Sequence, residues 1–293
     1  METKGQKRKV IFLSIFAVIV FSIFLKLDSL FSVANTLASR GWVLLSILSV
    51  SVLIRMIFAG FVVLIILPLI LRSGSWRNWL PEYLRIDRKI VFLGMLSFVV
   101  FGTLATVIAL GIGIFKGDLS VVFAFPDIRP DPDVIGWGYL LLALVPGIWE
   151  ELAFRGLIQS KFRTTFSVPV SIFFSALFFG LYHLSNIVNQ SPAQAIPGVV
   201  MAFFFGIGWG YMTIKARSVV PAMISHYLVD AMGQIFLNVD GTDPALATGF
   251  FLLLTLLFPV FAIFLTRGVY RSSKNVNDVT APSFQNFRKE ETR

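Results

Sequence analysis

The chain has 293 residues, of which 56% are hydrophobic and only 14% are charged. A soluble domain of this length does not need so much apolar surface, so the composition indicates a protein that crosses a membrane several times. The net charge of +9 lies in short loops and both tails, which is typical of topology signals and not of a nucleic-acid-binding surface. Because the chain has no cysteine, thiol catalysis, disulfides and cysteine metal sites are excluded.

Eight apolar segments follow one another along the chain, and a helix needs ~20 mostly apolar residues to cross a bilayer. The first is read as an uncleaved span and not as a signal peptide, because the chain continues as further apolar segments. The predicted fold is therefore all-α, a polytopic transmembrane bundle of about eight spans. These spans are expected at residues 10–25, 41–71, 90–115, 134–149, 168–188, 194–214, 218–237 and 245–265.

The distribution of Lys and Arg predicts the orientation of the chain in the membrane. With the N-terminus in the cytosol and eight crossings, 20 of the 25 Lys and Arg residues fall in cytosolic segments, as the positive-inside rule requires. Both termini are then cytosolic. We divide the chain into three N-terminal spans with their loops (1–133), a core of spans four to seven (134–237), a final span (238–266) and a disordered basic tail (267–293).

Two segments between predicted spans are expected on the cytosolic side of the membrane. Residues 72–89 are basic and hold Trp76 and Trp79, which is typical of a cytosolic loop lying on the membrane surface, where tryptophan prefers to be. An ordinary topogenic loop is the alternative, and we favour it. Residues 155–163 are expected to form the cytosolic turn after the fourth span.

The fourth span ends in two adjacent acids, Glu150 and Glu151, which are costly to place in a membrane and are therefore candidates for a functional site. Glu151 and Arg155 are four residues apart and can pair on one helix face. Glu150 points about 100° away and has no such partner in its own segment. Glu151 is thus predicted to be the braced acid, and Glu150 the carboxylate free for proton chemistry.

Both histidines of the chain lie in apolar segments. His183 follows Phe179 by four residues in the fifth span, and His226 precedes Asp230 by four in the seventh, so each pair shares a helix face. Buried ionisable groups on three spans cost least when they surround one water-holding cavity. We therefore predict that these groups converge with Glu150 and Glu151.

Several chemistries suit such a cluster. A carboxylate and an imidazole can take a proton from water and give it to a leaving amine, while a second histidine stabilises an oxyanion. The same groups could hold zinc, with Glu150, His183, His226 and Asp230 as candidate ligands. A proton-coupled transporter would also place Glu, His and Asp in its spans. A non-proteolytic scaffold is the third alternative.

The ordered motifs Glu150-Glu151-x-x-x-Arg155, Phe179-x-x-x-His183 and His226-x-x-x-Asp230 resemble those of the CAAX prenyl endopeptidase and bacteriocin-processing (CPBP, or Abi) family of intramembrane proteases. The resemblance implies cleavage of a peptide bond in a membrane-tethered polypeptide, prenylated or not. It also implies that Glu150 and His183 activate water, and that His226 and residue 230 support the oxyanion. Members are commonly labelled metalloproteases, whereas prenyl endopeptidases of the eukaryotic type resemble metal-independent glutamate enzymes.

Two points of the sequence disagree with a simple transfer from the family. The third motif often ends in Asn where this chain has Asp230, and an ionised carboxylate cannot donate a hydrogen bond. The depths of the site residues in the membrane also disagree. Counted from span ends at residues 155 and 219, Glu150 and His226 would lie ~8–10 Å below the membrane surface, whereas His183, counted from residue 168, would lie ~22 Å below it.

The expected partners are the lipid bilayer and the polypeptide substrate, with no nucleic acid. The expected location of this multi-pass protein is a prokaryotic plasma membrane.

Overall fold

In the computed structural model the described residues are 4–30, 44–117, 140–188, 192–236 and 244–271, and within these ranges all regular structure is helical. The long helices are α1 (Lys4–Leu30), α3 (Leu44–Phe61), α6 (Arg88–Lys116), α9 (Val168–Tyr182), α10 (Pro192–Ala216), α11 (Val220–Phe236) and α12 (Pro244–Val269). The shorter helices are α4 (Leu67–Leu71), α5 (Trp76–Tyr83) and α8 (Gln159–Arg163). The π-helical turns are η1 (Val62–Ile66), η3 (Pro146–Glu150) and η4 (Leu152–Ile158), and η5 (His183–Val188) is a 3₁₀ helix. The all-α prediction is confirmed for these residues.

Within the described ranges, five helical segments are long and apolar enough to cross a membrane: Val52–Leu71, Arg88–Lys116, Val168–Ile187, Ala195–Ala216 and Gly249–Val269. The outer surface of the bundle is apolar as well. Large side chains on different helices are half or more exposed, as expected for contact with lipid; they include Phe12, Ile57, Phe92 and Phe264. The chain is therefore a membrane protein, and the remaining predicted spans coincide with α1, with residues 140–158 and with α11.

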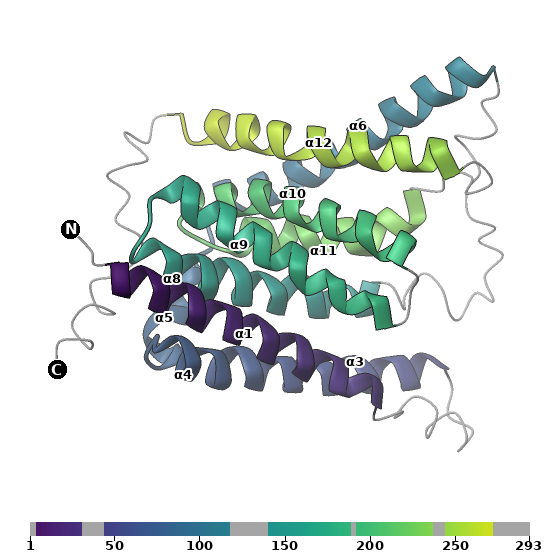
Figure 1. The fold of residues 1–293 in the computed structure, drawn as a ribbon. Helices are drawn as coiled ribbons and strands as arrows, with labels where there is room; N and C mark the ends of the chain where they lie inside the picture. The colour runs from purple at the N-terminus through teal and green to yellow at the C-terminus, as the bar shows by residue number, and fades with distance from the viewer. Residues whose placement is uncertain (1–3, 31–43, 118–139, 189–191, 237–243, 272–293) are drawn as a thin grey trace.

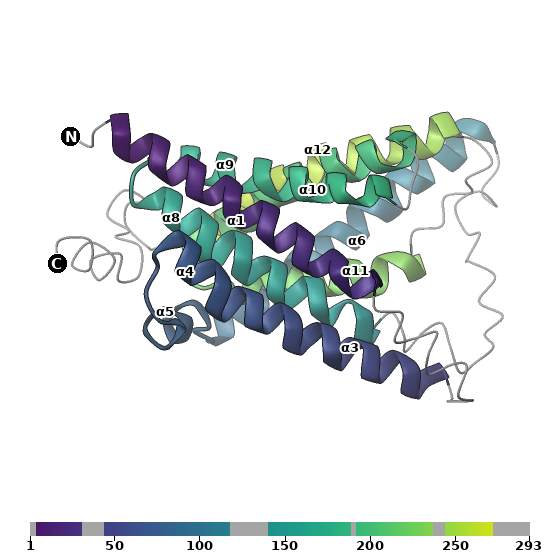
Figure 2. The ribbon, with the colours of Figure 1, turned by 60° about the horizontal axis from the view of Figure 1, so that its bottom comes forward.

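The helices form a bundle in which α9, α10 and α11 lie between two outer groups, α6 with α12 on one side and α1 with α3 and α4 on the other (Figure 1). The beginning of α1 and the end of α12 lie at the same end of the bundle, together with α5 and α8 (Figures 1 and 2). The helix that carries the two acids packs against α11 and α9, so its side chains face the middle of the bundle.

The predicted cytosolic turn at residues 155–163 is wrong. The helix that contains Glu150 continues through η4 and α8 to Arg163, and Arg155 is fully buried within it. The extension has a physical reason: η4 and α8 are almost entirely buried against α9 and α10, so apolar packing carries the helix past its charged residue.

This extension removes the disagreement between the depths of the predicted site residues. Counted from Arg163, Glu150 lies at most ~20 Å along its helix, and His183 lies ~22 Å from the start of α9 at Val168. His226 is only ~9 Å from the start of α11, but the turn before α11 is itself buried: Ser218 and Val219 have no exposed surface. The three side chains therefore reach one level.

Helix α5 covers the turn that precedes α11. The loop predicted for residues 72–89 is therefore wrong for residues 76–83, which form this helix. Trp79 is 2% exposed and faces protein. The carbonyl of Tyr83 accepts hydrogen bonds from the Val219 amide (2.9 Å) and the Ser218 hydroxyl (3.1 Å). The Tyr83 hydroxyl donates to Ser160 of α8. Helix α5 thus ties together the ends of the two helices that carry Glu150 and His226.

Two glycines of α10 lie where neighbouring helices pack closely. A methyl group at Gly206 would lie 3.0 Å from the backbone of Ala176 in α9, and one at Gly210 would lie 2.6 Å from the Gln159 side chain. The start of the expected tail at 267–293 is wrong, because α12 continues to Val269; residues 272–293 lie outside the described residues.

We expect Gly147→Ala to lower both thermal stability and activity. The added methyl group would lie 2.9 Å from Cβ of Tyr227, where η3 crosses α11, and overpacking of this kind costs about 1–3 kcal/mol. Thermal unfolding of the purified variant measures the effect. Gly111→Ala is the matched control, because no atom lies within 4 Å of its added methyl group. Equal melting temperatures for the two variants would contradict the close approach.

Candidate active site

The two acids lie where the helix changes from α to π geometry. Pro146 begins the π-helical turn η3, which ends at Glu150, and η4 begins immediately after Glu151. Proline lacks the N–H that an α-helical turn needs, and π-helical turns widen a helix locally and recur at functional sites. The consequence here is that the adjacent acids face different neighbours: Glu150 faces α9 and Glu151 faces α11.

Glu151 is fully buried and holds two cationic partners. Its Oε1 accepts a hydrogen bond from Arg155 Nη1 at 2.9 Å and another from His226 Nδ1 at 2.8 Å. The predicted Glu151–Arg155 pair is therefore confirmed. The guanidinium of Arg155 also lies 4.1 Å from the centroid of the Phe179 ring, a cation–π contact that is strong when desolvated. Glu151 thus fixes the position of His226 through Oε1.

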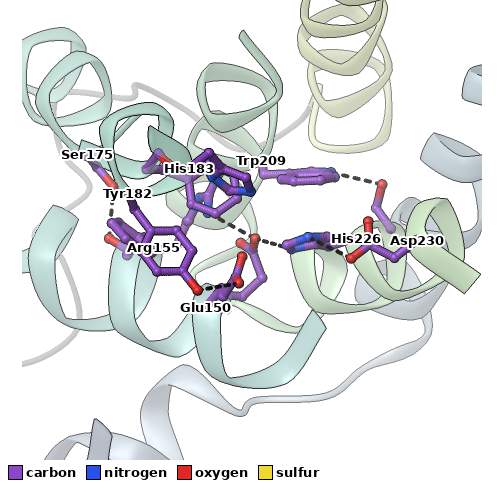
Figure 3. Close-up of polar contacts among 12 residues, drawn as sticks. Glu150, Arg155, Ser175, Tyr182, His183, Trp209, His226 and Asp230 are labelled. Atoms are coloured by element: carbon purple, nitrogen blue, oxygen red, sulfur yellow. Dashed lines mark hydrogen bonds and ion pairs between the residues drawn. The ribbon is translucent and has the colours of Figure 1, made fainter. Parts of the chain in front are cut away.

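Glu150 is 7% exposed and has one hydrogen-bond donor, the Tyr182 hydroxyl, which lies 3.1 Å from its Oε1. Its other oxygen, Oε2, is buried and has no partner among the described residues. His183, His226 and Asp230 are all near enough to act on its charge. Figure 3 shows Glu150 with Tyr182 on one side and the His226–Asp230 pair on the other. The predicted convergence of these groups is confirmed. Oε2 of Glu151 also has no partner among the described residues, so the two acids differ in their other oxygen: Oε1 of Glu151 is held by Arg155 and His226, whereas Oε1 of Glu150 is held only by Tyr182.

His183 lies at the point where α9 gives way to the 3₁₀ helix η5. Its Nδ1 is 2.8 Å from the carbonyl oxygen of Phe179. Because a carbonyl oxygen only accepts, Nδ1 carries the proton, and the neutral ring leaves Nε2 as an acceptor. The ring packs edge-to-face on Phe179 and on Tyr182, at centroid distances of 4.8 and 5.2 Å. His183 is thus held in the tautomer that can receive a proton at Nε2.

His226 is flanked by a carboxylate on each ring nitrogen. Nδ1 donates to Glu151, and Nε2 lies 3.3 Å from Asp230 Oδ2, as the shared helix face predicts. The ring can donate from both nitrogens only as the imidazolium cation. Asp230 is 37% exposed whereas His226 is 5% exposed, so the outer carboxylate is the one that water or substrate can reach.

Several supporting residues could not be found from sequence motifs. Trp209 stacks on His226 with centroids 4.3 Å apart, and its indole N–H donates to Ser225, which in turn bonds Ser97 of α6. Trp209 lies among the glycines of α10, and nothing in its spacing marks it as a site residue. Tyr182 gives no signal either, because it lies beside His183 in the sequence and does not follow the four-residue spacing.

A zinc site would need several of the candidate ligands to point at one ion with free donor atoms. No group of three or more His, Asp or Glu side chains placed to hold a metal ion occurs in the described ranges. The reason is visible at His226, whose two ring nitrogens are both engaged with carboxylates, and at His183, whose Nδ1 is bonded to a backbone carbonyl. As arranged here, the candidate ligands Glu150, His183, His226 and Asp230 do not form a zinc site.

Residues 132–232 match the family model described as type II CAAX prenyl endopeptidase Rce1-like. The match covers about a third of the chain and supports membership of the CPBP family, as the three motifs indicate. The matched segment contains every predicted site residue, from Glu150 to Asp230. No curated protein matches the chain. Together with the apolar helices, the Rce1-like match indicates a membrane endopeptidase of the CAAX-processing kind.

We expect Asp230→Asn in the Rce1-like segment to cleave at least as fast as the native chain at neutral pH. The amide keeps the shape of the side chain, can still accept from His226 Nε2, and adds a donor for an oxyanion. Asp230→Ala should lower kcat by roughly 10²-fold, the effect of losing one oxyanion donor or its support. The measurement is kcat for one tethered peptide. If Asn and Ala are equally inactive, the negative charge itself is required.

Proposed function

We propose that this protein is an intramembrane endopeptidase that hydrolyses a peptide bond close to the membrane anchor of a polypeptide. The observation that carries the proposal is the unpartnered Oε2 of buried Glu150, next to a histidine whose Nε2 is free to accept. A buried carboxylate oxygen without a partner is costly, and Glu150, unlike Glu151, has no cationic partner that holds its other oxygen, so a structural role explains it poorly. A water molecule between these two groups would satisfy both.

In the proposed mechanism a water held by Glu150 and His183 loses a proton to the carboxylate as its oxygen attacks the carbonyl carbon of the substrate. The tetrahedral oxyanion is stabilised by the Nε2–H of His226, which exchanges its contact with the partly exposed Asp230 for one with the oxyanion, while Glu151 and Trp209 hold the ring in place. The C–N bond then breaks, and the proton passes to the leaving amine. This uses each acid differently: Glu150 moves protons, while Glu151 holds Arg155 and His226.

We propose in addition that the chain crosses a prokaryotic plasma membrane eight times with both termini in the cytosol. The excess of Lys and Arg in the predicted cytosolic segments supports this orientation. The start of α1 and the end of α12 also lie at the same end of the bundle. The substrate is then a membrane-tethered polypeptide whose scissile bond reaches the level of Glu150 from the cytosolic side. A prenyl group is one anchor that fits this description, and an acyl chain is another.

The experiment is cleavage by purified protein reconstituted in sealed vesicles. Three forms of one peptide are compared, carrying a farnesyl anchor, an acyl anchor or no anchor. We expect the tethered forms to be cut and the free form to be cut much more slowly. A proton-coupled transporter would instead move a solute under a pH gradient without cutting any peptide, and a scaffold would do neither. The absence of cleavage of all three peptides would contradict the proposed function.

A further inference from the structure

Tyr182 is not part of the motif-based prediction, yet it is the residue that bonds Glu150. Its hydroxyl donates to Oε1 of Glu150 at 3.1 Å, and no other described residue donates to that carboxylate. Oε1 is bonded to the phenol, whereas Oε2 is buried and has no partner among the described residues. The hydroxyl therefore fixes the orientation of the Glu150 carboxylate in the site.

The ring of Tyr182 is enclosed by aromatic neighbours from three segments. Phe21 of α1 lies 5.4 Å away, Phe154 of η4 lies 5.6 Å away, and the His183 ring packs edge-on at 5.2 Å (centroid distances). Phe21 and Phe154 also contact each other at 5.8 Å. A ring packed in this way cannot rotate its hydroxyl away from Glu150 without displacing its neighbours. Tyr182 therefore contacts both residues that hold the proposed water, Glu150 through its hydroxyl and His183 through its ring.

We infer that Tyr182 is a positioning residue of the hydrolytic site, which orients the Glu150 carboxylate through its hydroxyl and His183 through its ring. Phe21 extends this support to α1, outside the matched segment 132–232, so the first helix belongs to the architecture of the site. The inference rests on the proposed function for its kinetic consequence but not for its geometry.

The test compares Tyr182→Phe with Tyr83→Phe. Both changes remove one tyrosine hydroxyl that donates a hydrogen bond: the partly buried Tyr182 donates to Glu150, and the buried Tyr83 donates to Ser160. We expect Tyr182→Phe to lower kcat roughly 10- to 100-fold, the range for a lost hydrogen bond to a charged group, with KM changed less than about 3-fold. Tyr83→Phe should leave kcat within about 2-fold, although both variants lose thermal stability.

A second readout separates this inference from the proposed function. The infrared band of the Glu150 carboxyl group, identified as the band lost in Glu150→Gln, should shift in Tyr182→Phe and stay in place in Tyr83→Phe. This measurement needs no substrate. If the native chain cleaves and Tyr182→Phe cleaves equally fast, the positioning role is wrong while the proposed function stands. If the infrared band does not move, the hydrogen bond itself is absent and the inference is overturned whatever the chain cleaves.

Discussion

Glu150→Gln should reduce peptide cleavage by roughly 10³-fold or more while leaving the fold intact. The amide has the size of the carboxylate and its oxygen can still accept from Tyr182, so packing is preserved. It cannot take a proton from water, and removal of a general base costs typically 10²–10⁴-fold. The loss should appear in kcat with little change in KM, because the change affects the transition state more than substrate binding. Initial rates with a tethered peptide measure it.

His183→Ala is the companion variant, since the proposed water is held from both sides. We expect a loss of similar size, and the double variant should be little worse than either single one, because groups that act as a unit are not additive. Thermal unfolding serves as the control for folding in each case. Wild-type rates in Glu150→Gln, with a normal melting temperature, would leave the free Oε2 without a catalytic meaning.

Arg155→Met should be the most destabilising single change in the site. Glu151 is fully buried and would lose its arginine partner, and breaking a buried ion pair by removing one side costs about 3–5 kcal/mol. The change also removes the cation–π contacts with Phe179 and Trp209. Reversible unfolding in mixed micelles should show this loss, and activity should fall with it because Glu151 also holds His226.

Arg267→Met is the matched control for Arg155→Met. Arg267 also donates a hydrogen bond and lies over an aromatic ring, that of Tyr211, but at an exposed position near the end of α12. Contacts of this kind are worth about 0.5–1 kcal/mol at exposed sites. A similar loss of stability in the two variants would mean that the buried pair contributes no more than a surface contact, and that Glu151 finds other partners.

The sequence was sufficient for the helical class and for the pairing of groups four residues apart. Glu151–Arg155, Phe179–His183 and His226–Asp230 are each in contact as predicted, because a spacing of four residues fixes the face of a helix whatever surrounds it. The convergence of the three pairs was also predictable, since isolated ionisable groups in a membrane are expensive.

What could not be predicted depends on contacts between segments far apart in the chain. The end of the fourth helix was misplaced at Arg155 because charge was taken to mark the membrane surface, whereas Glu151 and Phe179 make a buried arginine tolerable. Burial of Trp79 depends on α5 binding the turn before α11. Tyr182 reaches Glu150 from another helix, and no periodicity within its own segment indicates that contact.

The most direct measurement is mass spectrometry of one tethered peptide incubated in ¹⁸O-water with the native chain and with Glu150→Gln, at equal amounts of folded protein. A single cut with ¹⁸O in the new carboxyl terminus is expected for the native chain, and none at the same time point for the variant. An uncut peptide with the native chain, or the same labelled product from both proteins, would contradict hydrolysis by a water that Glu150 activates.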